Sequence, residues 1–200
     1  FYDEIEIVEY HPYWGVPRSI IVNEMLPKLY NDPSYFDRAG YEVTTVTGRR
    51  VSSSSVDWAG VANKEVPINV RQLPGRSNAL GELKILFPNK HAIYMHDTPA
   101  KSLFKRDRRA FSHGCIRLND PRAMAAAVLG KDEDYIASRL ADGRNDKDYL
   151  EQKVPVYVSY FTAWPSSDGS VAYYDDVYDR DRYLLKAMDI TSGVRASRAG

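Results

Sequence analysis

The hexapeptide Ser-His-Gly-Cys-Ile-Arg occupies residues 112–117 and contains the only cysteine of this 200-residue chain. Another histidine, His96, lies upstream in the stretch Ile-Tyr-Met-His-Asp-Thr-Pro of residues 93–99. One thiol cannot form an internal disulfide, and a lone cysteine is a poor zinc ligand. A thiol that an imidazole deprotonates is a nucleophile. The pattern therefore predicts that Cys115 is reactive, although most free cysteines are small buried hydrophobic residues.

The residues around Cys115 predict the rest of a catalytic centre. Gly114 permits a tight turn, and such a turn can direct the amides of His113, Gly114 and Cys115 at one oxyanion. His96 is the predicted base, which would need a carboxylate or a main-chain carbonyl to orient its ring. The alternative for His96 is a histidine whose hydrogen bonds are satisfied within a strand.

Two further side chains are candidates for substrate binding. Tyr94 lies two residues before His96 and therefore on the same face of a strand, where its hydroxyl could bind a carbonyl or pack in the core. Arg117 carries a guanidinium suited to carboxylates, with a surface ion pair as the alternative. The basic stretch at residues 101–109 could attract an acidic peptide or form an ordinary solvated loop.

Composition narrows the class of protein. The hydrophobic content of 44% and 200 residues indicate one globular domain with a real core. Lysine plus arginine (27) equals aspartate plus glutamate (27), which argues against a nucleic-acid-binding protein. No segment approaches the roughly 18 apolar residues of a membrane helix, and no group of residues has metal-ligand spacing.

Periodicity predicts a mainly β, α+β domain with helices at its edge. Strands are expected at residues 4–10, 41–46, 68–73, 83–87, 92–96, 154–160 and 171–174. Helices are expected at residues 17–29, 121–129, 133–140 and 181–188, with a short one through Phe36. Residues 17–66 are expected to form a mixed helical and loop cap, and residues 191–200 a flexible tail.

The spacing of His96, fifteen residues and then Ser-His-Gly-Cys resembles the signature of the YkuD-type L,D-transpeptidases. The Asn-Ala-Leu-Gly of residues 78–81 and the Pro-Tyr-Trp-Gly of residues 12–15 agree with the larger periplasmic members, which carry an inserted cap. The resemblance implies a YkuD-like β-sandwich or barrel core over residues 1–190 that lacks its first strands. Arg117 stands where the family often has asparagine.

The resemblance also implies roles for individual residues. It implies that the main-chain carbonyl of Asp97 orients His96, with the Asp97 side chain as the alternative, and that His113 shapes the turn and contacts substrate. The residues it adds to the predicted substrate groove are Trp14, Asn78 and Ser112. No cofactor or metal is implied.

The implied activity is transfer of an acyl group between peptidoglycan stem peptides. Cys115 would attack a donor tetrapeptide, release D-Ala and pass the acyl group to an acceptor amine, which gives a 3→3 cross-link. Water as acceptor would make the protein a carboxypeptidase or cysteine hydrolase, and an outer-membrane protein is a further conceivable acceptor. Carbapenems would acylate the same cysteine, and the location implied is the periplasm, with a membrane anchor left open. A non-catalytic wall-binding module is the remaining alternative.

Overall fold

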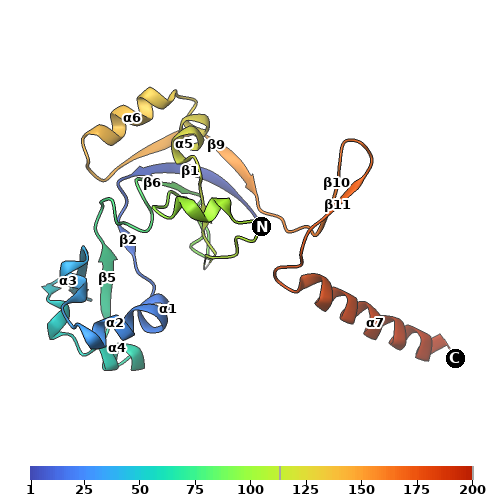
Figure 1. Ribbon diagram of the computed structural model, residues 1–200, viewed down its shortest axis with the longest axis horizontal. Coiled ribbons are helices and arrows are strands. Elements are labelled where there is room, and N and C mark those ends of the chain that lie inside the picture. Colours follow the sequence, from blue (N-terminus) through green and yellow to red (C-terminus); the bar gives the residue numbers. More distant parts are fainter. Residues whose placement is uncertain (113, 200) are drawn as a thin grey trace.

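Strand β1 (Tyr2–Tyr10) organises the molecule because it pairs on both of its sides. In the computed structural model, which describes residues 1–112 and 114–199 with only the backbone of 195–199, a five-stranded sheet has the order β8-β7-β6-β1-β9 (Figure 1). The other strands of this sheet are β6 (Leu83–Leu86), β7 (Met95–His96), β8 (Ile116–Arg117) and β9 (Asp146–Tyr157). All neighbours are antiparallel except β7 and β8.

Two helices, α5 (Pro121–Leu129) and α6 (Glu133–Ala141), contribute to the core of this sheet. The carboxylate of Asp120 accepts the amide of Ala123, which caps α5, and the helix ends at Gly130 with a φ of 63°. Local signals of this kind explain why the predicted bounds of both helices agree with the structure. Buried residues of α5 and α6 pack with buried residues of β1 and β6. Full burial of one large apolar side chain stabilises the fold by about 1.5–3 kcal/mol.

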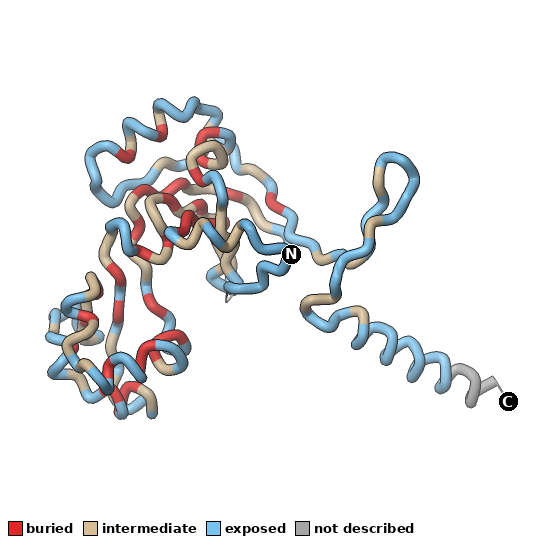
Figure 2. Tube along the Cα trace, viewed as in Figure 1, coloured by how far each residue is buried: buried red, intermediate tan, exposed pale blue. Residues whose placement is uncertain are grey.

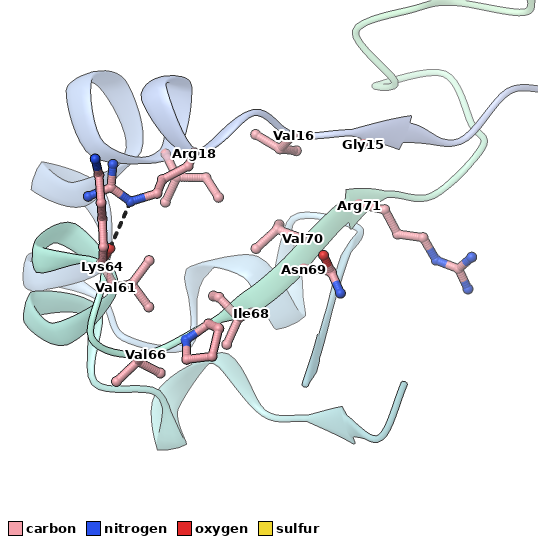
Figure 3. A pocket seen from close by; sticks show the side chains of 12 residues that line it. Gly15, Val16, Arg18, Val61, Lys64, Val66, Ile68, Asn69, Val70 and Arg71 are labelled. Atoms are coloured by element: carbon pink, nitrogen blue, oxygen red, sulfur yellow. Dashed lines mark hydrogen bonds between the residues drawn. The ribbon is translucent and has the colours of Figure 1, made fainter. Parts of the chain in front are cut away.

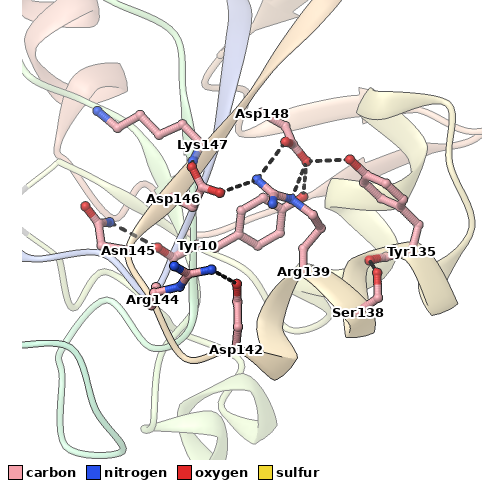
Figure 4. Close-up of polar contacts among 10 residues, drawn as sticks. All are labelled: Tyr10, Tyr135, Ser138, Arg139, Asp142, Arg144, Asn145, Asp146, Lys147 and Asp148. Carbon is pink, nitrogen blue, oxygen red and sulfur yellow. Dashed lines mark hydrogen bonds and ion pairs between the residues drawn. The ribbon is translucent and has the colours of Figure 1, made fainter.

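A polar network joins α6 to the strands β1 and β9 (Figure 4). Arg139 of α6 donates to both oxygens of Asp148 in β9, and the hydroxyls of Tyr10 and Tyr135 donate to the same carboxylate. Although burial disfavours the charged guanidinium, Asp148 and Asp146 raise the pKa of Arg139 above its ordinary value. Every charge in this network therefore has a close partner of opposite sign.

Residues 14–72 form a cap with a core of its own at the lower left of Figure 1. Its sheet has the order β2-β5-β3-β4, and Phe36 and Trp58 pack edge to face in its core with ring centroids 5.2 Å apart. Its strands are β2 (Trp14–Gly15), β3 (Tyr41–Thr45), β4 (Arg50–Val51) and β5 (Ile68–Gln72). Its helices and turns are α1 (Arg18–Ile20), η1 (Ile21–Met25), α2 (Leu26–Asn31), α3 (Tyr35–Arg38), η2 (Ser53–Ser55) and α4 (Trp58–Asn63).

The C-terminal segment extends away from both bodies. A hairpin of β10 (Ala163–Pro165) and β11 (Val171–Tyr173) precedes the long helix α7 (Arg180–Ala199). Figure 2 shows this segment as almost wholly exposed, in contrast to the buried stretches of the sheet and the cap. The helix continues through Ala199, and the flexibility expected for residues 191–200 stays a prediction.

The α+β class predicted from the sequence is confirmed. The remaining regular element is the 3₁₀ turn η3 (Lys101–Lys105), which follows β7. Within the described part of the chain, no helix combines the length and the apolar character that crossing a bilayer requires.

Candidate active site

The pairing of β7 with β8 brings the two halves of the predicted site together. The amide of Ile116 donates to the carbonyl of Tyr94 at 2.9 Å, and the amide of Leu118 donates to the carbonyl of His96 at 2.8 Å. His96 therefore lies opposite Arg117, and Cys115 lies beside Tyr94 two positions earlier. Because side chains alternate along a strand, these four residues share one face of the sheet.

His96 is held in one orientation by the chain itself. Its Nδ1 contacts the main-chain carbonyl of Asp97, which can only accept, so Nδ1 carries the proton and Nε2 keeps its lone pair. The residue is only 6% exposed. Burial lowers the pKa of His96 below its ordinary value, and the charge of Arg117 adds to this effect while the Asp97 carbonyl opposes it. A neutral imidazole with a free Nε2 is the form that acts as a base.

Cys115 is partly exposed and lies next to Tyr94. Its sulfur is 3.8 Å from the carbonyl oxygen of Ala92, and among residues 1–112 and 114–199 no hydrogen bond joins it to His96. Burial, followed by the neighbouring Cys115 thiol, raises the pKa of Tyr94 above its ordinary value. The structure thus places the thiol beside Tyr94, and the role of His96 as its base stays a prediction.

The turn before Cys115 depends on glycine for its conformation. Gly114 has a φ of 129°, which side chains rarely tolerate, whereas a Cβ there would meet only Ile93 at 3.8 Å. The amide of Gly114 donates to the hydroxyl of Ser112 at 3.2 Å, so this predicted oxyanion donor is occupied at rest. His113, the other residue predicted in this turn, lies outside the described residues.

The side chain of Asp97 supports the loop and leaves the orienting of His96 to its carbonyl. Its Oδ2 accepts the amide of Glu82 at 3.0 Å, and its Oδ1 lies 2.7 Å from the ammonium of Lys101. Gly81 makes this possible, since a Cβ there would come within 2.1 Å of Oδ2. Lys101 also donates to the carbonyls of Leu118 and Asn119. The first cation of the basic stretch therefore stabilises the loop and does not point to a peptide ligand.

Cys115 opens into a cavity of about 580 Å³. Arg109 and Arg117 line this cavity, and no carboxylate in the described part of the chain pairs with Arg117. The other lining residues are Leu103, Phe104, Phe111, Ser112, Gly114, Ile116, Val158 and Tyr178. None of the described lining residues belongs to the expected cap at 17–66, so the loop after β7 and the C-terminal segment form the walls.

Two residues that the resemblance assigned to the groove lie elsewhere. Asn78 is completely buried, donates to the carbonyls of Pro12 and Leu73, and accepts the amide of Leu80. Its buried side-chain amide therefore holds the junction between the cap and the sheet, away from the cavity at Cys115, which corrects its assignment to substrate. Trp14 pairs with Gln72 in the cap sheet and does not line the cavity at Cys115.

The cap contains a separate cavity of about 540 Å³ between β5 and the helices α1 and α4 (Figure 3). The Nε of Arg18 donates to the carbonyl of Val61 at the end of α4, and Arg71 pairs with Glu42. These cations serve the cap itself. In the described residues, no three acidic, histidine or cysteine side chains gather as a metal site would require.

Lys84 is a residue of this site that the sequence did not suggest. It belongs to β6, where it lies opposite His96 of β7, and its ammonium is 4.4 Å from the centre of the Tyr94 ring. The available signal was the alternation Leu-Lys-Ile at residues 83–85, which turns Lys84 away from the core. Which residue it would face depended on a pairing that the sequence does not specify.

Comparison with known proteins agrees with this geometry. Residues 2–158 match the model of the YkuD family, the L,D-transpeptidase catalytic domain. Over 187 residues the chain is 34% identical to a protein of Haemophilus influenzae (strain ATCC 51907 / DSM 11121 / KW20 / Rd) named "Putative L,D-transpeptidase". The alignment covers 92% of this chain and 37% of that relative, so the chain spans little more than a third of the relative's length.

Proposed function

Because this chain belongs to the YkuD family of L,D-transpeptidase catalytic domains, we propose that it cross-links peptidoglycan stem peptides through an acyl-enzyme on Cys115. The observation that supports this most directly is the β7–β8 ladder. It fixes the backbone of the only cysteine beside that of a buried histidine whose Nδ1 is already bonded to the Asp97 carbonyl. Nucleophile, base and orienting group are thereby in one short segment of sheet.

In the first half-reaction, Nε2 of His96 takes the thiol proton after the sulfur turns from the Ala92 carbonyl toward it. The thiolate attacks the carbonyl carbon between the L-centre of meso-diaminopimelate and the terminal D-Ala. The C–N bond breaks, His96 returns the proton to the leaving amine, and a thioester remains on Cys115. Catalytic hydrogen bonds often form only when substrate binds, so a Cys115–His96 hydrogen bond is not required before that.

In the second half-reaction, a side-chain amine of another stem attacks the thioester and His96 accepts its proton. The new amide is the 3→3 cross-link, and the thiolate leaves. The amides of the turn at Gly114 and Cys115 would stabilise the oxyanion in both steps, with Gly114 released from Ser112 as substrate binds. Arg109 and Arg117 would bind stem carboxylates at the cavity wall.

Hydrolysis of the thioester is the second candidate outcome. None of the described residues that line the cavity at Cys115 comes from the cap, so water can compete with the acceptor amine. The protein would then act as an L,D-carboxypeptidase or a cysteine hydrolase on the same stems. An outer-membrane protein as acceptor, acylation by carbapenems and a periplasmic location belong to this proposal as expectations from the family.

Incubation of the protein with purified disaccharide-tetrapeptide, followed by mass spectrometry, tests the proposal. We expect a dimer that has lost one D-Ala, and no product from the variant Cys115→Ala. Disaccharide-tripeptide alone would identify a carboxypeptidase. Failure of a carbapenem to add to well-folded protein, together with no product, would favour a non-catalytic wall-binding module.

A further inference from the structure

A row of ionisable side chains crosses the five-stranded sheet and ends at the proposed active site. The strand pairings place Arg117 opposite His96, His96 opposite Lys84, Lys84 opposite Glu9, and Glu9 opposite Lys147. Directly paired residues project to the same side of a sheet. All five side chains therefore lie on the face that carries Cys115, away from α5 and α6.

Lys84 is the member of this row that lies against Tyr94, the neighbour of Cys115. Its side chain is 18% exposed and its ammonium sits over the ring of Tyr94, 4.4 Å from the centroid. The Tyr94 hydroxyl in turn lies against the Cys115 thiol. A cation in this position is poorly screened by water, so its field acts on the sulfur with more than its usual strength.

Glu9 is the carboxylate next to Lys84, but the two charged groups are too far apart for a close ion pair. The carboxylate of Glu9 lies 3.8 Å from the ammonium of Lys84 and 4.0 Å from that of Lys147. Its other oxygen accepts the side-chain amide of Asn145 at 3.0 Å. The carboxylate is thus shared among three donors, and part of the charge of Lys84 remains available on the side of Tyr94.

The charged and titratable groups that face this cluster belong to every strand of the sheet. Burial lowers the pKa of Lys84; Glu9 opposes that effect, Lys147 adds to it and Cys115 opposes it more weakly. Lys84 and Arg117 both disfavour a proton on His96, while Asp97 favours one. The same cation therefore favours a negative sulfur and an uncharged imidazole.

We propose that Lys84 is a positioning residue that stabilises the thiolate of Cys115 while it keeps His96 unprotonated. The proposal rests on the proposed function, in which Cys115 is the nucleophile. Lys84 acts through the ring of Tyr94 and does not touch the substrate. It would stabilise the thiolate that forms when His96 takes the thiol proton, and before that step it would keep the imidazole free to act as the base.

Alkylation of Cys115 by iodoacetamide as a function of pH tests this directly, because the cysteine is the only one in the chain. In the variant Lys84→Met we expect alkylation at pH 7 to slow about tenfold, because the sulfur loses the nearby cation that favours its negative form. Lys84→Arg should restore the alkylation rate to within about threefold, because it retains the charge. Lys147→Met is the matched control, since it removes the other ammonium beside Glu9 and should leave the profile unchanged.

Each result decides between a charge effect and a structural one. An unshifted profile in Lys84→Met, or an equal shift in Lys84→Arg, would overturn the proposal. If Lys84→Met does not fold, Lys84→Gln gives the same comparison with a polar side chain. A shifted profile in a protein that makes no product from tetrapeptide would retain the role of Lys84 and remove the proposed function.

Discussion

Glu9 and Tyr10 are consecutive residues of β1, and they take part in polar clusters of opposite character. Tyr10 donates to Asp148 at 2.8 Å, within a network in which Arg139 and Tyr135 complete the bonding of the carboxylate (Figure 4). Glu9, on the other face, has its two ammonium partners at 3.8 and 4.0 Å. A saturated network stabilises the fold, whereas a loosely paired cation retains a field that can act on a neighbouring group.

The largest expected effect is on the face of Glu9. Replacing His96 with glutamine removes the proposed base and should slow product formation by about 10²–10⁴-fold. The melting temperature should change little, because glutamine can still donate to the Asp97 carbonyl. Rates are measured with disaccharide-tetrapeptide at pH 7.5. A rate equal to wild type would mean that the base is another residue, with His113 the first to test.

The opposite pattern is expected on the face of Tyr10. Arg139→Met leaves the carboxylate of Asp148 without its cation and should lower the free energy of unfolding by about 2–3 kcal/mol. The alkylation rate of Cys115 in the folded protein should stay at the wild-type value. Urea unfolding measures the free energy of unfolding. Arg144→Met is the control, since Arg144 is 82% exposed and its pair with Asp142 should contribute almost nothing.

Gly81→Ala should affect both stability and activity. The added Cβ would come within 2.1 Å of Asp97 Oδ2 at a φ of 61°, so Asp97 must move and its carbonyl would no longer orient His96. We expect a loss of about 1–3 kcal/mol in the free energy of unfolding, together with slower product formation. Gly130→Ala has nearly the same φ, 63°, and open space around it. Equal losses in the two variants would show that only the backbone conformation matters.

The smallest expected effect is a pH dependence of stability. Burial lowers the pKa of His96 below its ordinary value of 6.5, so the folded protein binds this proton less tightly than the unfolded chain does. The contribution of His96 to the free energy of unfolding is therefore complete above about pH 6.5, and it is lost as the pH falls below that value. Urea unfolding at pH 7.5 and 5.5 should show a steeper loss for wild type than for His96→Gln. Parallel losses would contradict the shift.

Local signals made part of this fold predictable from the sequence. Asp120, Pro121 and Gly130 define α5 because a capping carboxylate, a proline in the first turn and a glycine in the left-handed region act within a few residues. The beginning of β9 was missed because residues 146–153 are mostly charged. That stretch forms an edge strand, where polar side chains face water and periodicity is weak.

The site was predictable as a set of residue types but not as a geometry. Cys115 and His96 could be singled out, because a lone thiol cannot form an internal disulfide and a histidine upstream can serve as its base. The partner of each depended on register, and a slip by one residue would exchange the faces of a strand. Lys84 therefore came to light only through its pairing with His96, and Asn78 proved to be part of the scaffold.

The parallel pairing of β7 with β8 has a consequence for how such a domain can diverge. The ladder bonds at Tyr94 and His96 fix the relative position of Cys115 and His96, whatever the length of the segment that connects them. Insertions and deletions at residues 102–111 would thus reshape the cavity wall without moving the reacting atoms. A single-residue insertion between Tyr94 and His96 would reverse the histidine to the core side. Related chains should accordingly vary in length in the segment that matches residues 102–111, and never between the positions that match Tyr94 and His96.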